Sequence, residues 1–81
     1  MARFLDIHTI PSSLVREDLV MASRSVKEAA PDVKVLQTCY NLEEGRAWCL
    51  TEADNPTAVE RAHLQVNMPF ESIRRIEVIE G

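Results

Sequence analysis

Asp6 and His8 are the first side chains of the sequence that could bind a metal ion or move a proton. One residue separates them, so on a β-strand both would project from the same face. A carboxylate beside an imidazole can orient a general base, or the two groups can together coordinate a divalent ion. The same spacing is also common in strands where neither group has a chemical role.

A second group of reactive side chains lies further along the chain. Cys49 falls in a run of residues with strand-forming types, Glu52 lies near the end of that run, and His63 lies on the apolar stripe of a following helix. If Cys49 shares a sheet face with Asp6, His8 and Cys39, the face gathers carboxylate, imidazole and thiolate, which suit borderline divalent ions such as Ni²⁺, Zn²⁺, Co²⁺ and Cu²⁺. Two structural alternatives remain open: a reduced cysteine that is simply a small buried hydrophobe, and a Glu52–His63 hydrogen bond in place of ligation.

The elements that must position these residues follow from the hydrophobic pattern. Alternation predicts strands at residues 4–10, 33–40, 46–53 and 73–79. An apolar stripe with spacings of 4, 3, 4 and 3 predicts a helix between the first two strands, formed by Val15, Leu19, Ala22, Val26 and Ala29. A second helix is predicted at residues 56–66. The order βαββαβ predicts an α+β, ferredoxin-like fold of one domain, residues 1–81, with strand order 4-1-3-2 and both helices on one face.

Turn and cap residues support these boundaries. Ser12 or Ser13 is expected to cap the first helix. Asn55 is a candidate cap of the second helix, where the following proline fits the first helical position. Gly45 can adopt a positive φ in the hairpin loop, and Asn67 is a usual residue just past a helix C-terminus.

The faces of the sheet decide which groups meet. If Trp48 points toward the helices, Cys49 lies on the uncovered face, which we expect to carry Asp6 and His8 as well. A three-residue hairpin loop would pair Tyr40 with Trp48, a favourable aromatic pair, and would set Cys39 opposite Cys49. A slip of one residue would send Cys39 to the other face.

The face without helices has no cover from its own chain. We expect it to mix apolar and polar groups, with Phe4 and Ile10 beside Asp6 and His8, which is typical of a surface that packs on a partner. A homodimer joined sheet to sheet, in the manner of a dimeric α/β barrel, is therefore predicted, with a site or pocket between the subunits.

Composition excludes several function classes. The chain has 81 residues, a net charge of −4 and nine dispersed Lys and Arg, so no concentrated basic footprint for nucleic acid exists. No secretory signal and no long apolar run is present, which predicts a cytoplasmic protein without a membrane partner. Two cysteines are too few for a disulfide framework. No nucleophile-and-base pattern or phosphate-binding glycine loop occurs either.

At the level of motifs, the chain resembles a family of small bacterial ferredoxin-like proteins that includes a dimeric nickel-binding protein. The family pattern has an aromatic-x-Asp-x-His first strand, a Cys-Leu-x-Glu-Ala third strand, and a His about eleven residues after that Glu. The matching residues here are Phe4, Asp6, His8, Cys49, Leu50, Glu52, Ala53 and His63. Residues 21–25 and 66–68 lack the additional His and Asp of the nickel-binding type, which argues against a surface that holds several nickel ions. The resemblance implies a binding protein rather than an enzyme.

Together these observations predict a cytoplasmic homodimer that binds a divalent transition metal, with nickel as the ion that the resemblance implies. His8 and Asp6 are the first candidates for ligands, followed by Cys49, His63 and Glu52. The alternative is a dimeric α/β-barrel protein that binds a small molecule or acts as a cofactor-free oxygenase or isomerase, with His8 as general base.

Overall fold

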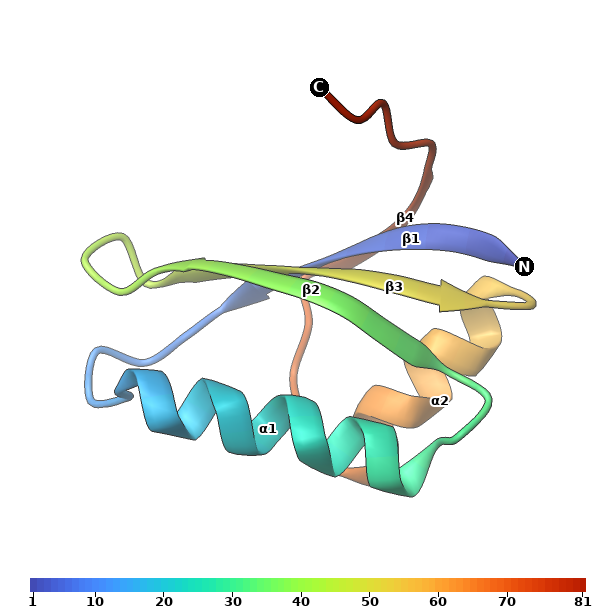
Figure 1. Ribbon diagram of the computed structural model, residues 1–81. Helices are drawn as coiled ribbons and strands as arrows, with labels where there is room; N and C mark the ends of the chain where they lie inside the picture. The colour runs from blue at the N-terminus through green and yellow to red at the C-terminus, as the bar shows by residue number, and fades with distance from the viewer.

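The computed structural model describes residues 1–81 and consists of one four-stranded antiparallel sheet covered on one face by two helices (Figure 1). The elements, in chain order, are β1 (Ala2–Thr9), α1 (Arg16–Ala29), β2 (Lys34–Asn41), β3 (Arg46–Ala53), α2 (Pro56–Gln65) and β4 (Ser72–Ile76). The strand order is β2-β3-β1-β4. The predicted ferredoxin-like α+β fold and its strand order are confirmed.

The boundaries of α2 follow the sequence signals. The Asn55 side chain accepts a hydrogen bond from the Ala58 amide at 2.9 Å, and Pro56 opens the helix. Beyond the C-terminus, Asn67 has a φ of 54°, the left-handed conformation that asparagine tolerates. Gly45 has a φ of 67° in the β2–β3 loop. At each of these positions, the conformational or capping preference of one residue type fits the observed helix end or turn.

The start of α1 differs from the prediction. The helix begins at Arg16, with Val15 in the N-cap position and no cap from Ser12 or Ser13. Asp18 instead accepts a hydrogen bond from the Val15 amide at 2.8 Å. An acid at this position satisfies a free N–H group and also interacts favourably with the helix dipole. The final strand is also shorter than predicted, and residues 77–81 extend away from the sheet on the side opposite the helices (Figure 1).

The predicted register of the β2–β3 hairpin is wrong by one residue. Asn41 pairs with Arg46, so Cys39 lies opposite Trp48 and Cys49 lies opposite Thr38. Because a shift of one residue moves a side chain to the other face, the two thiols project from opposite faces of the sheet. Both cysteines are free.

The assignment of faces in β1 and β3 is also reversed. Phe4, Asp6 and His8 of β1 point toward the helices and are 1%, 0% and 4% exposed. The half-buried Trp48 and Leu50 of β3 lie on the uncovered face. The prediction placed the bulkiest side chains under the helices, whereas the fold puts the smaller residues of β3 there. Alternation fixes which residues share a face, but it does not say which face is covered when both are partly apolar.

The hydrophobic core occupies the end of the sheet near α2. Its largest fully buried apolar members are Phe4, Val33 and Val59, joined by Val26 from α1. Val26 is the one buried residue of α1, while Leu19 and Ala22 on the same stripe are half-buried. The N-terminal half of α1 therefore lies less tightly against the sheet than its C-terminal half.

Candidate metal centre

Asp6, His8 and His63 form a buried cluster between the sheet and α2. Asp6 and His8 come from the inner face of β1, and His63 comes from the sheet-facing side of α2. One potential ligand atom from each residue lies within 4.8 Å of the other two. The two imidazole rings stack, with centroids 5.1 Å apart. The tertiary structure thus joins two neighbours in sequence to a residue more than fifty positions away.

Backbone carbonyls fix the tautomer of both histidines. His8 Nδ1 lies 2.8 Å from the Pro69 carbonyl oxygen, and His63 Nδ1 lies 2.7 Å from the Val59 carbonyl oxygen. A carbonyl oxygen only accepts, so each Nδ1 carries the hydrogen and donates it. Each Nε2 then keeps a free lone pair. This is the usual arrangement around a metal-binding histidine, in which the second ring nitrogen is held by an outer hydrogen bond.

The Asp6 carboxylate is held in a similar way. Thr51 donates its hydroxyl to Asp6 Oδ1 at 3.1 Å, which orients the group. The other oxygen, Oδ2, lies 3.6 Å from His63 Nε2 and makes no hydrogen bond. His8 Nε2 is also buried without a hydrogen-bond partner. Buried polar atoms without partners are rare because they lose their hydration without compensation, so two of them in one cluster require an explanation.

Burial changes the proton affinities of the cluster. It raises the pKa of Asp6 to about 7, although the hydrogen bond from Thr51 opposes the shift. Burial lowers the pKa of His63, against the effect of its hydrogen bond to Val59 and with a smaller contribution from His8. Both shifts have the same cause: a charged form loses more hydration energy than a neutral form does. Burial therefore favours the neutral forms of Asp6 and His63.

The donor set and its spacing fit a divalent transition metal. Two imidazole nitrogens and one carboxylate oxygen are typical ligands of such ions, and three protein ligands leave positions open for other groups. Bonds of ~2.0–2.2 Å hold neighbouring ligand atoms about 3 Å apart. The present separations of up to 4.8 Å are therefore somewhat wide, and side-chain movements of about an ångström would close them around an ion.

Cys49 lies close to the cluster without belonging to it. It is the direct neighbour of Asp6 in the β1–β3 register and lies on the same face. Its sulfur contacts the Thr38 hydroxyl at 3.6 Å. Burial raises the pKa of this thiol to about 11, partly offset by Thr38, so the group is a neutral thiol. His8 and Cys49 share a face as predicted, but that face is the one beneath the helices.

Glu52 lies on the opposite face of the sheet. Its side chain forms an ion pair with Arg3 at 3.4 Å, and both side chains are partly exposed. The structure thus separates Glu52 from the histidines. It removes the predicted alternative of a Glu52–His63 hydrogen bond, since His63 Nδ1 contacts Val59 instead.

Sequence reasoning missed the groups that support the cluster. Thr51 carried a usable signal, because its position two residues after Cys49 places both on one face of β3. The carbonyls of Pro69 and Val59 gave no comparable signal, since any residue type supplies a carbonyl. The predicted second rank of His63 also reflects this limit: only the packing of α2 brings it to the first strand.

The fold and the buried cluster define a class: small ferredoxin-like α+β proteins with a candidate His/Asp metal site. Residues 4–76 match the family described as "Nickel responsive protein SCO4226-like", and the chain belongs to this family. The crystal structure of SCO4226 from Streptomyces coelicolor A3(2) has the same fold, with a TM-score of 0.89 and 21% sequence identity over 98% of this chain and 100% of that chain. No curated protein matches the chain significantly. The family resemblance seen in the sequence is confirmed.

The two helices have 14 and 10 residues. Neither is long and apolar enough to cross a membrane.

Proposed function

We propose that this protein binds a divalent transition-metal ion, nickel first among them, through His8 Nε2, His63 Nε2 and Asp6 Oδ2. The observation that carries the proposal is the pair of buried atoms without partners, His8 Nε2 and Asp6 Oδ2, beside a third donor atom. A bound cation would compensate both atoms at once. It would also stabilise the Asp6 carboxylate, which burial otherwise disfavours.

The outer hydrogen bonds support a binding role. His8 and His63 donate to the carbonyls of Pro69 and Val59, and Thr51 donates to Asp6. These three bonds hold the side chains so that their free lone-pair atoms lie close together. Such outer contacts make histidine and carboxylate better ligands because they fix orientation before the ion arrives. The description of the family as nickel responsive favours nickel within the group of ions that this donor set suits.

Titration calorimetry with Ni²⁺ and Zn²⁺ on metal-free protein tests this function. We expect one site per chain, and at least a hundredfold weaker binding in His8→Ala and His63→Ala, because each removes a ligand. Glu52→Gln is the matched control, since it removes a carboxylate on the other face of the same sheet. Absence of binding by the parent protein, or equal loss in Glu52→Gln, would contradict the proposal.

We further propose that two copies associate through the uncovered face of the sheet. Its centre is apolar and consists of Leu5, Ile7, Trp48 and Leu50, all half-buried in the single chain. Arg3, Arg46 and Glu52 surround this centre with charge. An apolar patch with a polar rim is typical of a protein interface. The homodimer thus remains a prediction, now with a different set of contact residues, and the cytoplasmic location remains one as well.

A further inference from the structure

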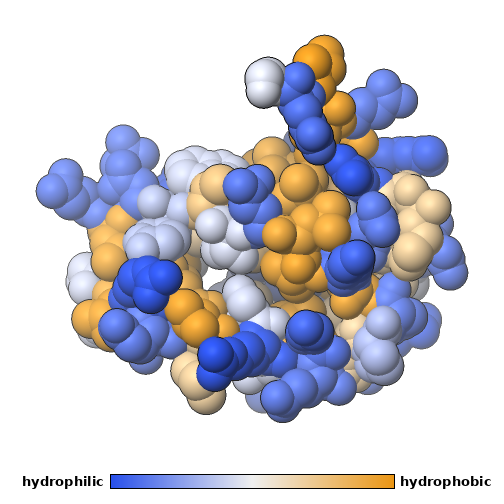
Figure 2. Space-filling model, in the orientation of Figure 1, coloured by the Kyte–Doolittle hydropathy of each residue, from blue (hydrophilic) through white to orange (hydrophobic).

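A cavity of about 400 Å³ lies between α1 and the sheet. Figure 2, in the orientation of Figure 1, shows a small opening between the sheet above and α1 below. The cavity is lined by residues of α1 and of the inner face of β1, β2 and β3. The segment before α1 and the segment after α2 also contribute. The volume is within the range of small-molecule sites in proteins, which is roughly 300–1,000 Å³.

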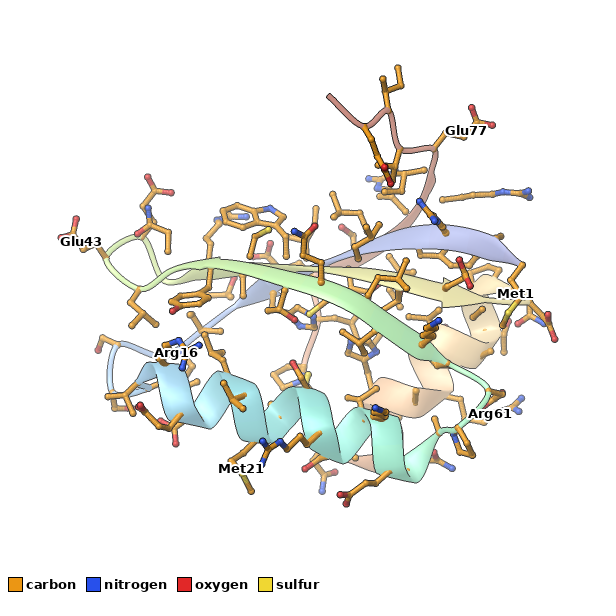
Figure 3. The ribbon with its side chains drawn as sticks, in the orientation of Figure 1. Met1, Arg16, Met21, Glu43, Arg61 and Glu77 are labelled. Atoms are coloured by element: carbon orange, nitrogen blue, oxygen red, sulfur yellow. The ribbon has the colours of Figure 1, made fainter.

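The cavity results from small side chains on facing elements. Met21 projects from the outer side of α1, away from the sheet (Figure 3), while Ala22 and Ser23 line the cavity. Ala47 and Thr51 of β3 are the small residues that face them across it. The Ser23 and Thr38 hydroxyls are 3.3 Å apart and link α1 to β2. This hydrogen bond holds the helix beside the sheet while its neighbours leave the space unfilled.

The chemistry of the walls limits what can bind. Most of the apolar lining is aliphatic, contributed by residues such as Ile10, Leu14, Leu19, Val35 and Met68. No Lys or Arg lines the cavity, and its two acidic residues are Asp6 and Asp18. An anionic ligand would therefore meet carboxyl groups and no counter-charge. No Phe, Tyr or Trp is present either, so a planar aromatic ligand would find no ring of these residues on which to stack.

One unpaired acceptor lies in the wall of the cavity. His8 lines the cavity, and its Nε2 atom is buried without a partner, so a ligand reaches it once the neighbouring side chains shift slightly. Since His8 Nδ1 carries the hydrogen, Nε2 can only accept. A ligand that satisfies this atom must donate a hydrogen, as an alcohol does.

From these observations we propose that the cavity is a binding site for a small uncharged aliphatic alcohol, whose hydroxyl donates to His8 Nε2 and whose chain packs between α1 and the sheet. The site lies within one chain and is separate from the interface between subunits. It does not depend on metal binding, although an ion on His8 Nε2 would compete with the hydroxyl.

A chain-length series of 1-hexanol to 1-nonanol tests this site, with binding followed by amide NMR of metal-free protein in EDTA. We expect shifts at the cavity wall, including the amides of Ala22 and Thr38. Affinity should increase about fourfold for each added methylene, the factor that corresponds to ~0.8 kcal/mol per buried CH₂. Methyl heptyl ether, which has no hydrogen to donate, should bind severalfold more weakly than 1-octanol.

Ala22→Leu, which adds bulk to the cavity wall, should weaken 1-octanol binding at least tenfold, since ~1.4 kcal/mol corresponds to a factor of ten. Ala29→Leu makes the same change at an exposed position of α1 and serves as the matched control. Ala22→Val replaces Ala22→Leu if the larger side chain prevents folding.

Three results would overturn the proposal. The first is absence of binding by any of the alcohols, and the second is equal binding by octanoate and 1-octanol. The third is unchanged binding in the Ala22 variants, which would place the alcohol on the apolar uncovered face instead. Because EDTA is present throughout, none of these results depends on whether the protein binds metal.

Discussion

The two faces of the sheet are built from alternate residues of the same strands, yet they differ in burial and in polarity. On the inner face, Asp6 and His8 are buried beneath α2 together with His63. On the outer face, Leu5, Ile7, Trp48 and Leu50 form an apolar surface with no cover from this chain. Protein interiors usually collect the bulky apolar residues. Here polar groups with two unpaired acceptor atoms occupy part of the interior, as the proposed metal-binding role requires.

The largest expected effect is on oligomeric state, because only the outer face is proposed to join two copies. Leu50→Asp should raise the dimer dissociation constant roughly a thousandfold, because an unpaired carboxylate would be buried in an apolar interface. Metal affinity should stay within about twofold, since Leu50 points away from the cluster. Analytical ultracentrifugation and metal titration measure the two quantities. A parent protein that is monomeric at all concentrations would show that the outer face is not an interface.

The pH dependence of the unfolding free energy should reveal the titration of Asp6 on the inner face. The pKa of Asp6 is about 7 in the folded chain and near 3.8 when unfolded, so the folded state binds the proton more tightly between these values. Asp6 therefore contributes stability at low pH that is lost as the pH rises from about 4 to 7, by roughly 1 kcal/mol per pH unit.

The lowered pKa of His63 acts in the opposite direction below its unfolded value of 6.5, where its contribution is lost as the pH falls. The His63 contribution cancels when the metal-free parent is compared with Asp6→Asn, because His63 is present in both proteins. Urea unfolding at several pH values gives the difference in unfolding free energy. A difference that does not change with pH would show that Asp6 titrates normally.

Metal affinity should depend on pH through the same group. Binding requires the Asp6 carboxylate, and the pKa near 7 means that protonation competes increasingly below neutral pH. Affinity at pH 6 should therefore be about tenfold weaker than at pH 8. Calorimetry in buffers of different ionisation enthalpy would also detect the released proton. Equal affinities at both pH values, with no proton release, would exclude Asp6 as a ligand.

The smallest effects are expected for two consecutive residues, Thr51 and Glu52, which lie on opposite faces of β3. Thr51→Val removes the hydrogen bond to Asp6 Oδ1 and should weaken metal binding about tenfold, the lower end of outer-contact effects. Glu52→Gln alters only a partly exposed ion pair with Arg3, so unfolding free energy should change by less than about 0.5 kcal/mol and metal affinity should not change. If both variants weakened binding equally, the effect would not be specific to the inner face.

The sequence by itself determined the order of the elements, the ends of α2, the positive φ at Gly45, and the pairing of Asp6 and His8 on one face. These depend on local chemistry: periodicity, capping and turn residues act over a few positions, so the sequence displays them directly. The family pattern added His63 as a further candidate ligand, but it did not place that residue beside the first strand.

The tertiary structure alone decided which face the helices cover, the register that separates Cys39 from Cys49, and the removal of Glu52 from the histidines. It also supplied the carbonyls of Val59 and Pro69 and the space beside Ala22. The reason is physical: alternation is symmetric between the two faces of a strand, and only packing against the rest of the chain distinguishes them.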